Sequence, residues 1–303
     1  TDIGTVTVTQ SGGTTFSSTV NASVVTLTAT TGSITFNGAL TATTLNTAAS
    51  AYNLALNAGG TITDAVTFAN TGSVTLGDAS SDSITFTGGL TLLAPSQANI
   101  AGTVQTTNNT ISIGDSNTSI VLTANTTISS GTAGLTLGGT VNGAFSLTLN
   151  SSGTTTLSST VGNSTALTSV TTDSGGTIAI NGASVRTSGT QTYNDAATLG
   201  ADTTLTTTNN NVTFNGTLNS DGATPRNLTL ALGTGTLVIG DGTADTVGAT
   251  NPLGAISITG ALDLNAAITS ASSLSVSLAS DLGANVTTSG TQTYSGAVTL
   301  STS

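Results

Sequence analysis

The chain alternates apolar and small polar residues in short runs that recur along its whole length. Examples are Thr5-Val6-Thr7-Val8-Thr9, Asn53-Leu54-Ala55-Leu56-Asn57 and Ser273-Leu274-Ser275-Val276-Ser277-Leu278. A period of two over four to six residues predicts a β-strand with one buried face. Asn-Gly, Gly-Gly, Ser-Gly and Gly-Asp pairs separate the runs and predict turns, because these residues adopt turn conformations readily. We therefore expect an all-β protein of many short strands.

Several runs are repeated nearly unchanged. Residues 32–40 (GSITFNGAL) resemble residues 82–90 (DSITFTGGL) fifty positions later, with further copies at residues 211–218 and, more loosely, 255–262. Residues 187–193 (TSGTQTY) recur as residues 288–294, which lie 101 positions later. These offsets predict a basic unit of about 17, 20 or 25 residues, a size typical of solenoid repeats.

Two architectures fit closely spaced strands that leave no room for crossover helices. The first is a parallel β-helix, or β-solenoid, over residues 1–303, and the runner-up is a string of tandem β-sandwich domains. Sandwiches usually have larger aromatic cores and a linker after each domain of about 100 residues, whereas this chain has nine aromatic residues and shows no such linker. We predict the continuous solenoid, with coils of about 20 residues and so about 15 coils.

Composition supports this prediction and narrows the function. Glutamate, lysine, histidine and cysteine are absent, the 13 acidic residues are all aspartate, and the only basic residues are Arg186 and Arg226. Helix surfaces are normally rich in Glu and Lys, so helices are disfavoured. The usual general bases and activated nucleophiles are also missing, and we predict that the chain is not an enzyme. The net charge of −11 disfavours nucleic acid and anionic membranes as partners.

The aspartates offer one candidate metal site. Asp78 with Asp82, and Asp241 with Asp245, share a Gly-Asp-x-x-x-Asp spacing. Oxygen-rich loops can hold Ca²⁺, which takes six to eight oxygen ligands. The simpler interpretation is that each Gly-Asp pair forms a turn, and we favour it. For the two arginines and for Tyr52, Tyr193 and Tyr294 we expect solvated or packed side chains rather than a binding site, although the tyrosines have the flat rings that stack on sugars.

The repeats resemble a known family. The strings Thr-Ser-Gly-Thr-Gln-Thr-Tyr, Val-Thr-Phe-Asn-Gly-Thr-Leu and Leu-Val-Ile-Gly-Asp-Gly look like repeats of filamentous-haemagglutinin-like adhesins and related autotransporter passengers of bacteria. The resemblance covers the whole chain. It implies a parallel β-helix, secretion to the bacterial cell surface, and a role in adhesion, biofilm or filament formation. It carries no catalytic residue.

Taken together, the sequence predicts an extracellular structural or adhesive repeat protein that forms a surface fibre, stalk or filament. We expect the chain to be a segment of a longer protein, without a membrane-inserted segment or a cofactor. Its expected partners are further copies or repeats of itself, surface glycans or other cells. An alternative is an ice-binding solenoid, because Thr-x-Thr pairs occur at Thr5, Thr26, Thr41 and Thr206. That function requires one pair per coil in strict register.

Overall fold

The computed structural model describes residues 2–28, 31–222, 224–241 and 244–301. Within them the chain forms parallel β-strands and no helix, and the strands stack in about 14 turns of a β-solenoid. The predicted fold class is thereby confirmed. Tandem sandwiches, the runner-up, are not observed, because strand pairing in the described residues is parallel rather than antiparallel. The number of turns is close to the predicted number of about 15 coils.

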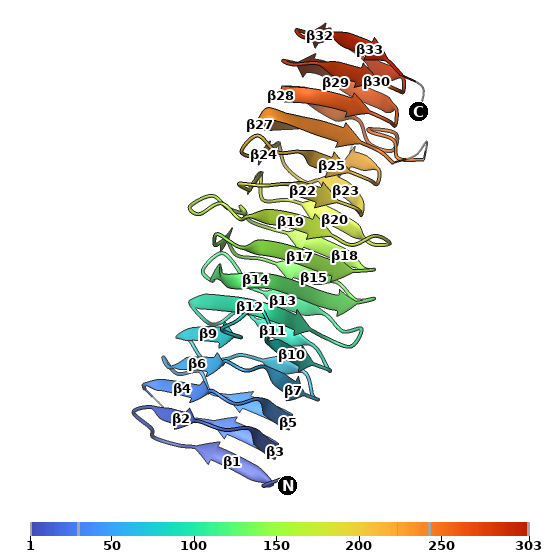
Figure 1. The fold of residues 1–303 in the computed structure, drawn as a ribbon. Helices are drawn as coiled ribbons and strands as arrows, with labels where there is room; N and C mark the ends of the chain where they lie inside the picture. The colour runs from blue at the N-terminus through green and yellow to red at the C-terminus, as the bar shows by residue number, and fades with distance from the viewer. Residues whose placement is uncertain (1, 29–30, 223, 242–243, 302–303) are drawn as a thin grey trace. The chain divides into compact units, whose positions relative to one another are not determined.

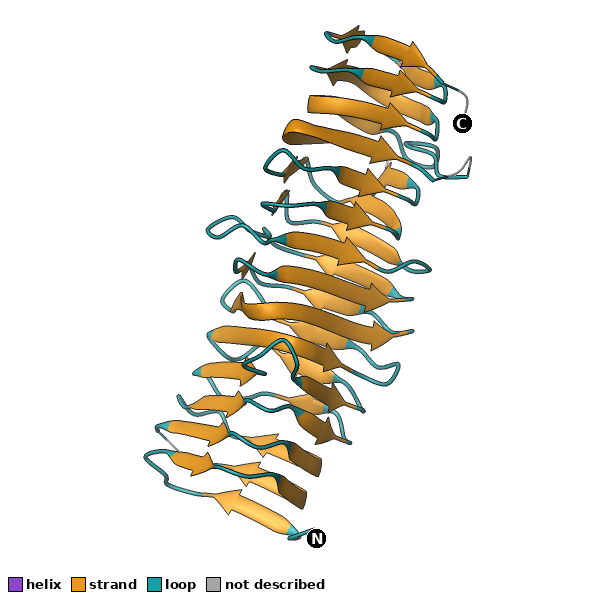
Figure 2. Cartoon of the chain, in the orientation of Figure 1, coloured by secondary structure: helices purple, strands orange, loops and turns teal. Residues whose placement is uncertain are grey.

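The chain divides into two compact units, Thr1–Gly153 and Thr154–Ser303, which are blue to green and green to red in Figure 1. Each unit consists of parallel strands joined by short loops (Figure 2). In each, the strands of a coil fall in three rows, and a strand pairs with its counterpart in the next coil. Residues paired in successive strands are 17 positions apart at the shortest, as in Ala271 and Thr288, and 28 at the longest, as in Leu228 and Ile256.

In unit 1, the first row contains β2, β4, β6, β9, the start of β12, the start of β14, and β16. The second row contains the starts of β3 and β5, then β7, β10, the ends of β12 and β14, and β17. The third row contains β1, the ends of β3 and β5, then β8, β11, β13 and β15. Their bounds are β1 Thr5–Val8, β2 Thr14–Phe16, β3 Val20–Leu27, β4 Ser33–Phe36, β5 Leu40–Thr47, β6 Asn53–Leu56, β7 Gly60–Ile62, β8 Val66–Thr67, β9 Ser73–Leu76, β10 Ser83–Phe86, β11 Leu90–Leu92, β12 Gln97–Gln105, β13 Ile111–Ile113, β14 Ser119–Gly131, β15 Leu135–Leu137, β16 Val141–Asn142 and β17 Ser146–Ser151.

In unit 2, the first row contains β21, β24, the starts of β27 and β28, the end of β29, and β32. The second row contains β19, β22, β25, the ends of β27 and β28, β30 and β33. The third row contains β18, β20, β23, β26, the start of β29, and β31. Their bounds are β18 Thr154–Leu157, β19 Ser169–Thr172, β20 Thr177–Ile180, β21 Ser184–Arg186, β22 Gln191–Tyr193, β23 Ala196–Leu199, β24 Thr203–Thr206, β25 Val212–Phe214, β26 Leu218–Ser220, β27 Arg226–Ile239, β28 Leu253–Leu264, β29 Ile268–Val276, β30 Ser280–Leu282, β31 Val286–Thr288, β32 Gln292–Tyr294 and β33 Val298–Leu300.

Apolar side chains point inward and stack on their counterparts in neighbouring coils. One such ladder in the first row of unit 1 consists of Phe16, Phe36, Leu56, Leu76, Ile100 and Leu122. Phe36 is fully buried, and its ring stacks on Phe16 with centroids 4.5 Å apart. Because each inward residue contacts the coils before and after it, thin aliphatic ladders suffice as a core without many aromatic side chains.

The sequence repeats do not lie on a common row. The Ile-Thr-Phe strand of β4 lies in the first row of unit 1, whereas its copy fifty residues later, β10, lies in the second. Similarly, the segment ending at Tyr193 runs from the first to the second row of unit 2, and the copy ending at Tyr294 runs from the third to the first. The repeat therefore specifies a local strand and corner, and it fits at different corners of the coil.

A second pair of corners shows the same 101-residue offset. Asn108 and Asn209 both adopt φ of 57°. Each carboxamide oxygen accepts a hydrogen bond from a backbone N–H of the next coil, at Thr132 (3.1 Å) and Thr234 (3.0 Å). The glycine before each donor also has a positive φ, and a Cβ at Gly131 would lie 2.3 Å from Asn108 Oδ1. Glycine is therefore required where the asparagine contacts the next coil.

Asparagine oxygens link successive coils at several other corners. The printed sequence shows no motif for these contacts beyond an asparagine near a strand end, and sequence reasoning did not identify them. In each contact the Oδ1 atom accepts a backbone N–H from the following coil, at 2.8 to 3.1 Å: Asn53 to Ser73, Asn125 to Ser146, Asn211 to Thr236 and Asn227 to Ala255. These bonds satisfy backbone donors at corners, where regular strand pairing stops.

Candidate functional site

The most elaborate polar network surrounds Gln191, which is fully buried in β22. Its Nε2 atom donates hydrogen bonds to Val185 O (3.1 Å), Thr187 Oγ1 (3.3 Å) and Thr206 O (3.0 Å). Its Oε1 atom accepts one from the hydroxyl of Tyr193 (3.0 Å). A primary amide buried in this way holds the corner in one conformation, because each lost bond would leave a polar group without water.

Tyr193 lies in the same strand and belongs to the core. Its ring stacks on Phe214 of the next coil, with centroids 4.9 Å apart and planes 16° apart. Burial raises the pKa of its hydroxyl strongly. Tyr52 is buried as well, so the expectation of packed side chains is confirmed for these two tyrosines.

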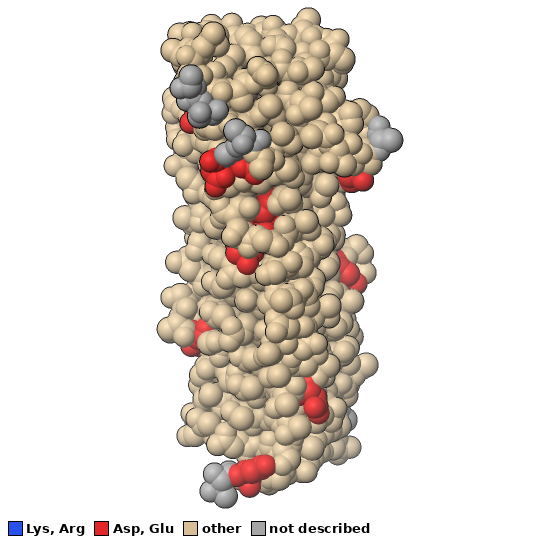
Figure 3. Space-filling view, turned by 90° about the vertical axis from the view of Figure 1, so that its right-hand side faces the viewer, with Lys and Arg blue, Asp and Glu red and all other residues tan. Residues whose placement is uncertain are grey.

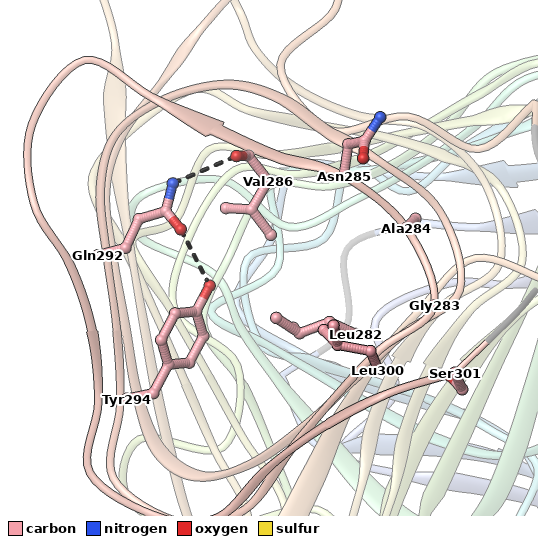
Figure 4. Close-up of a pocket in the computed structure, with 9 residues that line it drawn as sticks. All are labelled: Leu282, Gly283, Ala284, Asn285, Val286, Gln292, Tyr294, Leu300 and Ser301. Carbon is pink, nitrogen blue, oxygen red and sulfur yellow. Dashed lines mark hydrogen bonds between the residues drawn. The ribbon is translucent and has the colours of Figure 1, made fainter.

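The copy of this network at the C-terminal side of unit 2 is open to solvent. Gln292 Nε2 donates to Val286 O (3.2 Å) and Thr288 Oγ1 (3.3 Å), and the Tyr294 hydroxyl donates to Gln292 Oε1 (3.2 Å). Figure 4 shows Gln292 and Tyr294 at the rim of a hollow that Leu282 and Leu300 also line. The volume of the hollow is about 380 Å³. Among the described residues, no further coil packs over this hollow.

The hollow has little chemistry of its own. Its lining consists of Leu282, Gly283, Ala284, Asn285, Val286, Gln292, Tyr294, Leu300 and Ser301, none of which carries a charge at neutral pH. The one titratable group is Tyr294, and partial burial raises the pKa of its hydroxyl. With amides, a phenol and aliphatic carbons, the surface suits packing against another apolar, hydrogen-bonding surface rather than catalysis.

The predicted calcium ligands lie in two turns. Asp82 Oδ2 accepts hydrogen bonds from the backbone N–H groups of Asp78 (2.9 Å) and Ala79 (2.8 Å), and Asp245 Oδ2 accepts one from Asp241 N (3.4 Å). Partial burial, together with the charge of Asp82, raises the pKa of Asp78. The second aspartate of each pair thus caps its own turn, which agrees with the favoured turn interpretation.

In the described ranges, no three acidic side chains come together as metal ligands. Calcium at Asp78, Asp82, Asp241 and Asp245 therefore stays a prediction. None of the described residues forms a helix long and apolar enough to cross a membrane.

Charged side chains are sparse on the surface. In Figure 3 the acidic groups appear as separate patches on an otherwise uncharged face. Arg226 forms a bidentate pair with Asp221, at 2.9 Å and 3.2 Å, and this contact lowers the pKa of Asp221. The pair is exposed, so its contribution to stability is small. Arg186 is exposed in β21, as expected for a solvated side chain.

Asp195 is the one acidic group that the described structure buries completely, at 1% exposure. Its Oδ1 atom accepts a hydrogen bond from Gly176 N (2.8 Å), whereas Oδ2 has no partner. Burial, opposed in part by this hydrogen bond, raises the pKa of the carboxyl, and the nearby charge of Asp173 raises it further. Sequence reasoning did not single out Asp195, because Asn194-Asp195 looks like any other polar turn.

Thr-x-Thr pairs form only a short array. Thr41 pairs with Thr61, and Thr61 with Thr85. The column then continues with Asn21 on one side and Gln105 on the other. Other columns also change residue type, as where Thr35 is followed by Ala55. These columns therefore lack the strict register that an ice lattice requires.

Comparisons with protein-family models, with curated proteins and with solved structures found no match.

Proposed function

We propose that this chain is a secreted structural or adhesive repeat protein of the bacterial cell surface, where it contributes to a fibre, stalk or filament. The observation that carries the proposal is the stacking of one kind of coil throughout each unit. Inward apolar side chains form neighbour-to-neighbour ladders, and asparagine side chains link the coils at several corners. Such an array extends in one direction and resists unfolding by local contacts alone.

The outer surface suits exposure to the medium. It is formed mainly by threonine, serine and asparagine side chains, and charged residues make up 5% of the chain. Hydroxyl and amide groups form hydrogen bonds with water, with glycans and with similar surfaces without the salt sensitivity of ion pairs. We infer that partners are further copies or repeats, surface glycans or other cells. The net charge of −11 argues against nucleic acid.

We also infer a non-enzymatic role. The hollow beside Tyr294 contains no acid, base or nucleophile that titrates near neutral pH. The buried Asp195 is one carboxylate with a raised pKa, and its Oδ1 atom accepts a hydrogen bond from the backbone N–H of Gly176 in the preceding coil. General acid–base chemistry uses positioned groups of matched pKa at a substrate site, and neither place supplies such a set. The function therefore rests on surface and rigidity rather than on chemistry.

The proposal is tested on cells of the source organism with an antibody raised against residues 1–303. Labelling of intact cells, and its loss after brief external protease treatment, is the expected result. A strain that lacks the gene should adhere less to surfaces or to other cells, with adhesion restored by the intact gene. Labelling that requires permeabilised cells would refute surface exposure, and unchanged adhesion of the deletion strain would refute the adhesive role.

A further inference from the structure

The buried carboxylate of Asp195 lies in the middle of unit 2, at the corner between β22 and β23. Its side chain is 1% exposed, and its Oδ2 atom is buried without a hydrogen-bond partner. Buried polar atoms in native structures normally have a partner, and an ionised carboxylate can accept bonds on both oxygens. Buried charges are either paired or bound to a metal ion, so this oxygen is a potential ligand.

The carboxylate points into the loop that joins β19 to β20 in the preceding coil. At the end of this loop, Gly176 N donates a hydrogen bond to Asp195 Oδ1 (2.8 Å). At its start, Thr172 Oγ1 accepts hydrogen bonds from Asn194 N (3.0 Å) and Asp195 N (3.3 Å). Both ends of the loop are thus fixed on the corner at Asp195, and residues 173–175 bridge the two contacts.

A second carboxylate lies on the same loop. Asp173 is the first residue after β19, and its charge acts on the buried carboxyl. Burial, the largest factor, and the negative charge of Asp173 both raise the pKa of Asp195, whereas the hydrogen bond from Gly176 lowers it. Two neighbouring carboxylates, one of them with a dry oxygen, attract a cation, because the ion offsets both the repulsion and the lost hydration.

We propose that Asp195 Oδ2 and the Asp173 carboxylate bind a calcium ion, which joins the loop of residues 173–176 to the following coil. This inference does not depend on the proposed surface role. Ca²⁺ takes six to eight oxygen ligands and accepts backbone carbonyls and water beside carboxylates. Loop carbonyls and water complete the shell. Two carboxylates are few for this ion, so we expect a Kd of about 10⁻⁴–10⁻³ M, the range of extracellular modules.

The ion can enter from the side of the loop. Ser174 and Gly175 are exposed, and a Cβ at Gly175 would contact nothing within 4 Å. On the other side the following coil packs closely, because a Cβ at Gly216 would lie 2.8 Å from Asp195 O. A loop that can adjust its oxygens suits Ca²⁺ better than Mg²⁺, which demands near-ideal octahedral geometry.

The test is calorimetric titration of the 303-residue chain with calcium chloride at neutral pH, after divalent ions have been removed with a chelator. We expect a saturable binding heat. Millimolar calcium should also raise the thermal unfolding midpoint, because an ion that binds the folded chain stabilises it by mass action. Hydrogen exchange of the peptide that contains residues 169–180 should slow in calcium, since the ion fixes this loop.

Three variants locate the site. Asp195→Asn keeps an oxygen that can accept the bond from Gly176 and replaces the other oxygen by an amide nitrogen, which does not bind Ca²⁺. Asp173→Asn removes the second charge. Each should weaken calcium binding by about tenfold or more, because affinity follows the number of charged ligands. Asp64→Asn removes the same charge at an exposed aspartate of unit 1 and should leave binding unchanged. Circular dichroism verifies that the variants remain folded.

Calcium binding by the parent chain and by Asp64→Asn, with its loss in both Asp195→Asn and Asp173→Asn, supports the site. A parent chain that shows neither binding heat nor a shifted midpoint in millimolar calcium overturns it. So does parent-like affinity in Asp195→Asn or in Asp173→Asn, which would place the ion elsewhere. Equal weakening in all three variants also overturns it, because it would indicate attraction by the net charge alone.

Discussion

The two copies of the glutamine corner allow one prediction with an internal control. Gln191→Leu removes an amide that is fully buried, whereas Gln292→Leu removes the same amide from a corner open to solvent. The bonds within each corner are equivalent in partner and length, to Val185 or Val286 and to the tyrosine of the same strand. The variants therefore differ mainly in whether water can replace the lost bonds.

The magnitude follows from the groups left behind. Gln191→Leu leaves the Tyr193 hydroxyl and the Thr206 carbonyl in a dry interior, and each unsatisfied buried group costs about 1–3 kcal/mol. We expect a loss of about 3 kcal/mol in the free energy of unfolding, partly offset by the added apolar carbon. At Gln292 water satisfies the same groups, and we expect a loss of about 0.5 kcal/mol or less, typical of surface substitutions.

The assay combines urea unfolding followed by circular dichroism with hydrogen exchange of the peptide that contains residues 184–193. Local exchange is included because coil arrays can unfold in parts, which would blur a single transition. Equal losses in the two variants, or a larger loss in Gln292→Leu, would refute the view that burial of this network stabilises the corner.

Three further predictions follow from the same structure. Phe36→Ala should lower the free energy of unfolding by about 3–5 kcal/mol, measured by urea unfolding, whereas Thr35→Ala on the outward side of that strand should change it by about 0.5 kcal/mol or less; similar losses would contradict the assignment of the core. Because burial raises the pKa of Asp195, the folded chain binds that proton more tightly than the unfolded chain. Its contribution to stability is thus fully present below the ordinary aspartate pKa and falls as pH rises through the raised value. Asp195→Asn should therefore be more stable than the parent chain at neutral pH, with a difference that disappears in acid; a constant difference in urea midpoints across pH would be inconsistent with this. Gly131→Ala should lower the thermal unfolding midpoint, since its Cβ would lie 2.3 Å from Asn108 Oδ1 at a φ of +64°, and an unchanged midpoint would show that the corner yields easily.

Local features of the fold could be predicted from the sequence, because each depends on a few neighbouring residues. Ile34-Thr35-Phe36 alternates in sequence and forms β4, with Ile34 and Phe36 buried. The packing of Tyr52 and Tyr193, the turns at Asp82 and Asp245, and the parallel solenoid itself were also expected. Each depends on the alternation of a strand or on the chemistry of a turn, and both are encoded within a few neighbouring residues.

Other features depended on which coils become neighbours. The equivalence of Tyr193 and Tyr294 is visible in sequence, yet Tyr193 is buried and Tyr294 lines a solvent-filled hollow. Asp195, whose side chain is fully buried, is indistinguishable in sequence from exposed aspartates. Asn108 and Asn209 meet glycines 23 and 24 positions later, at Gly131 and Gly233, a spacing that varies with the length of each coil.

By itself, then, the amino-acid sequence determined the strand content, the inward and outward face of each strand, and the chemistry available, because side-chain alternation and residue inventory are local properties. The tertiary structure decided on which row each repeat lies, which residues stack on one another, and which of the two glutamine corners is exposed to solvent. The physical reason is that the offset between residues of paired strands varies from 17 to 28 positions, so a constant sequence offset does not correspond to a constant place in the stack.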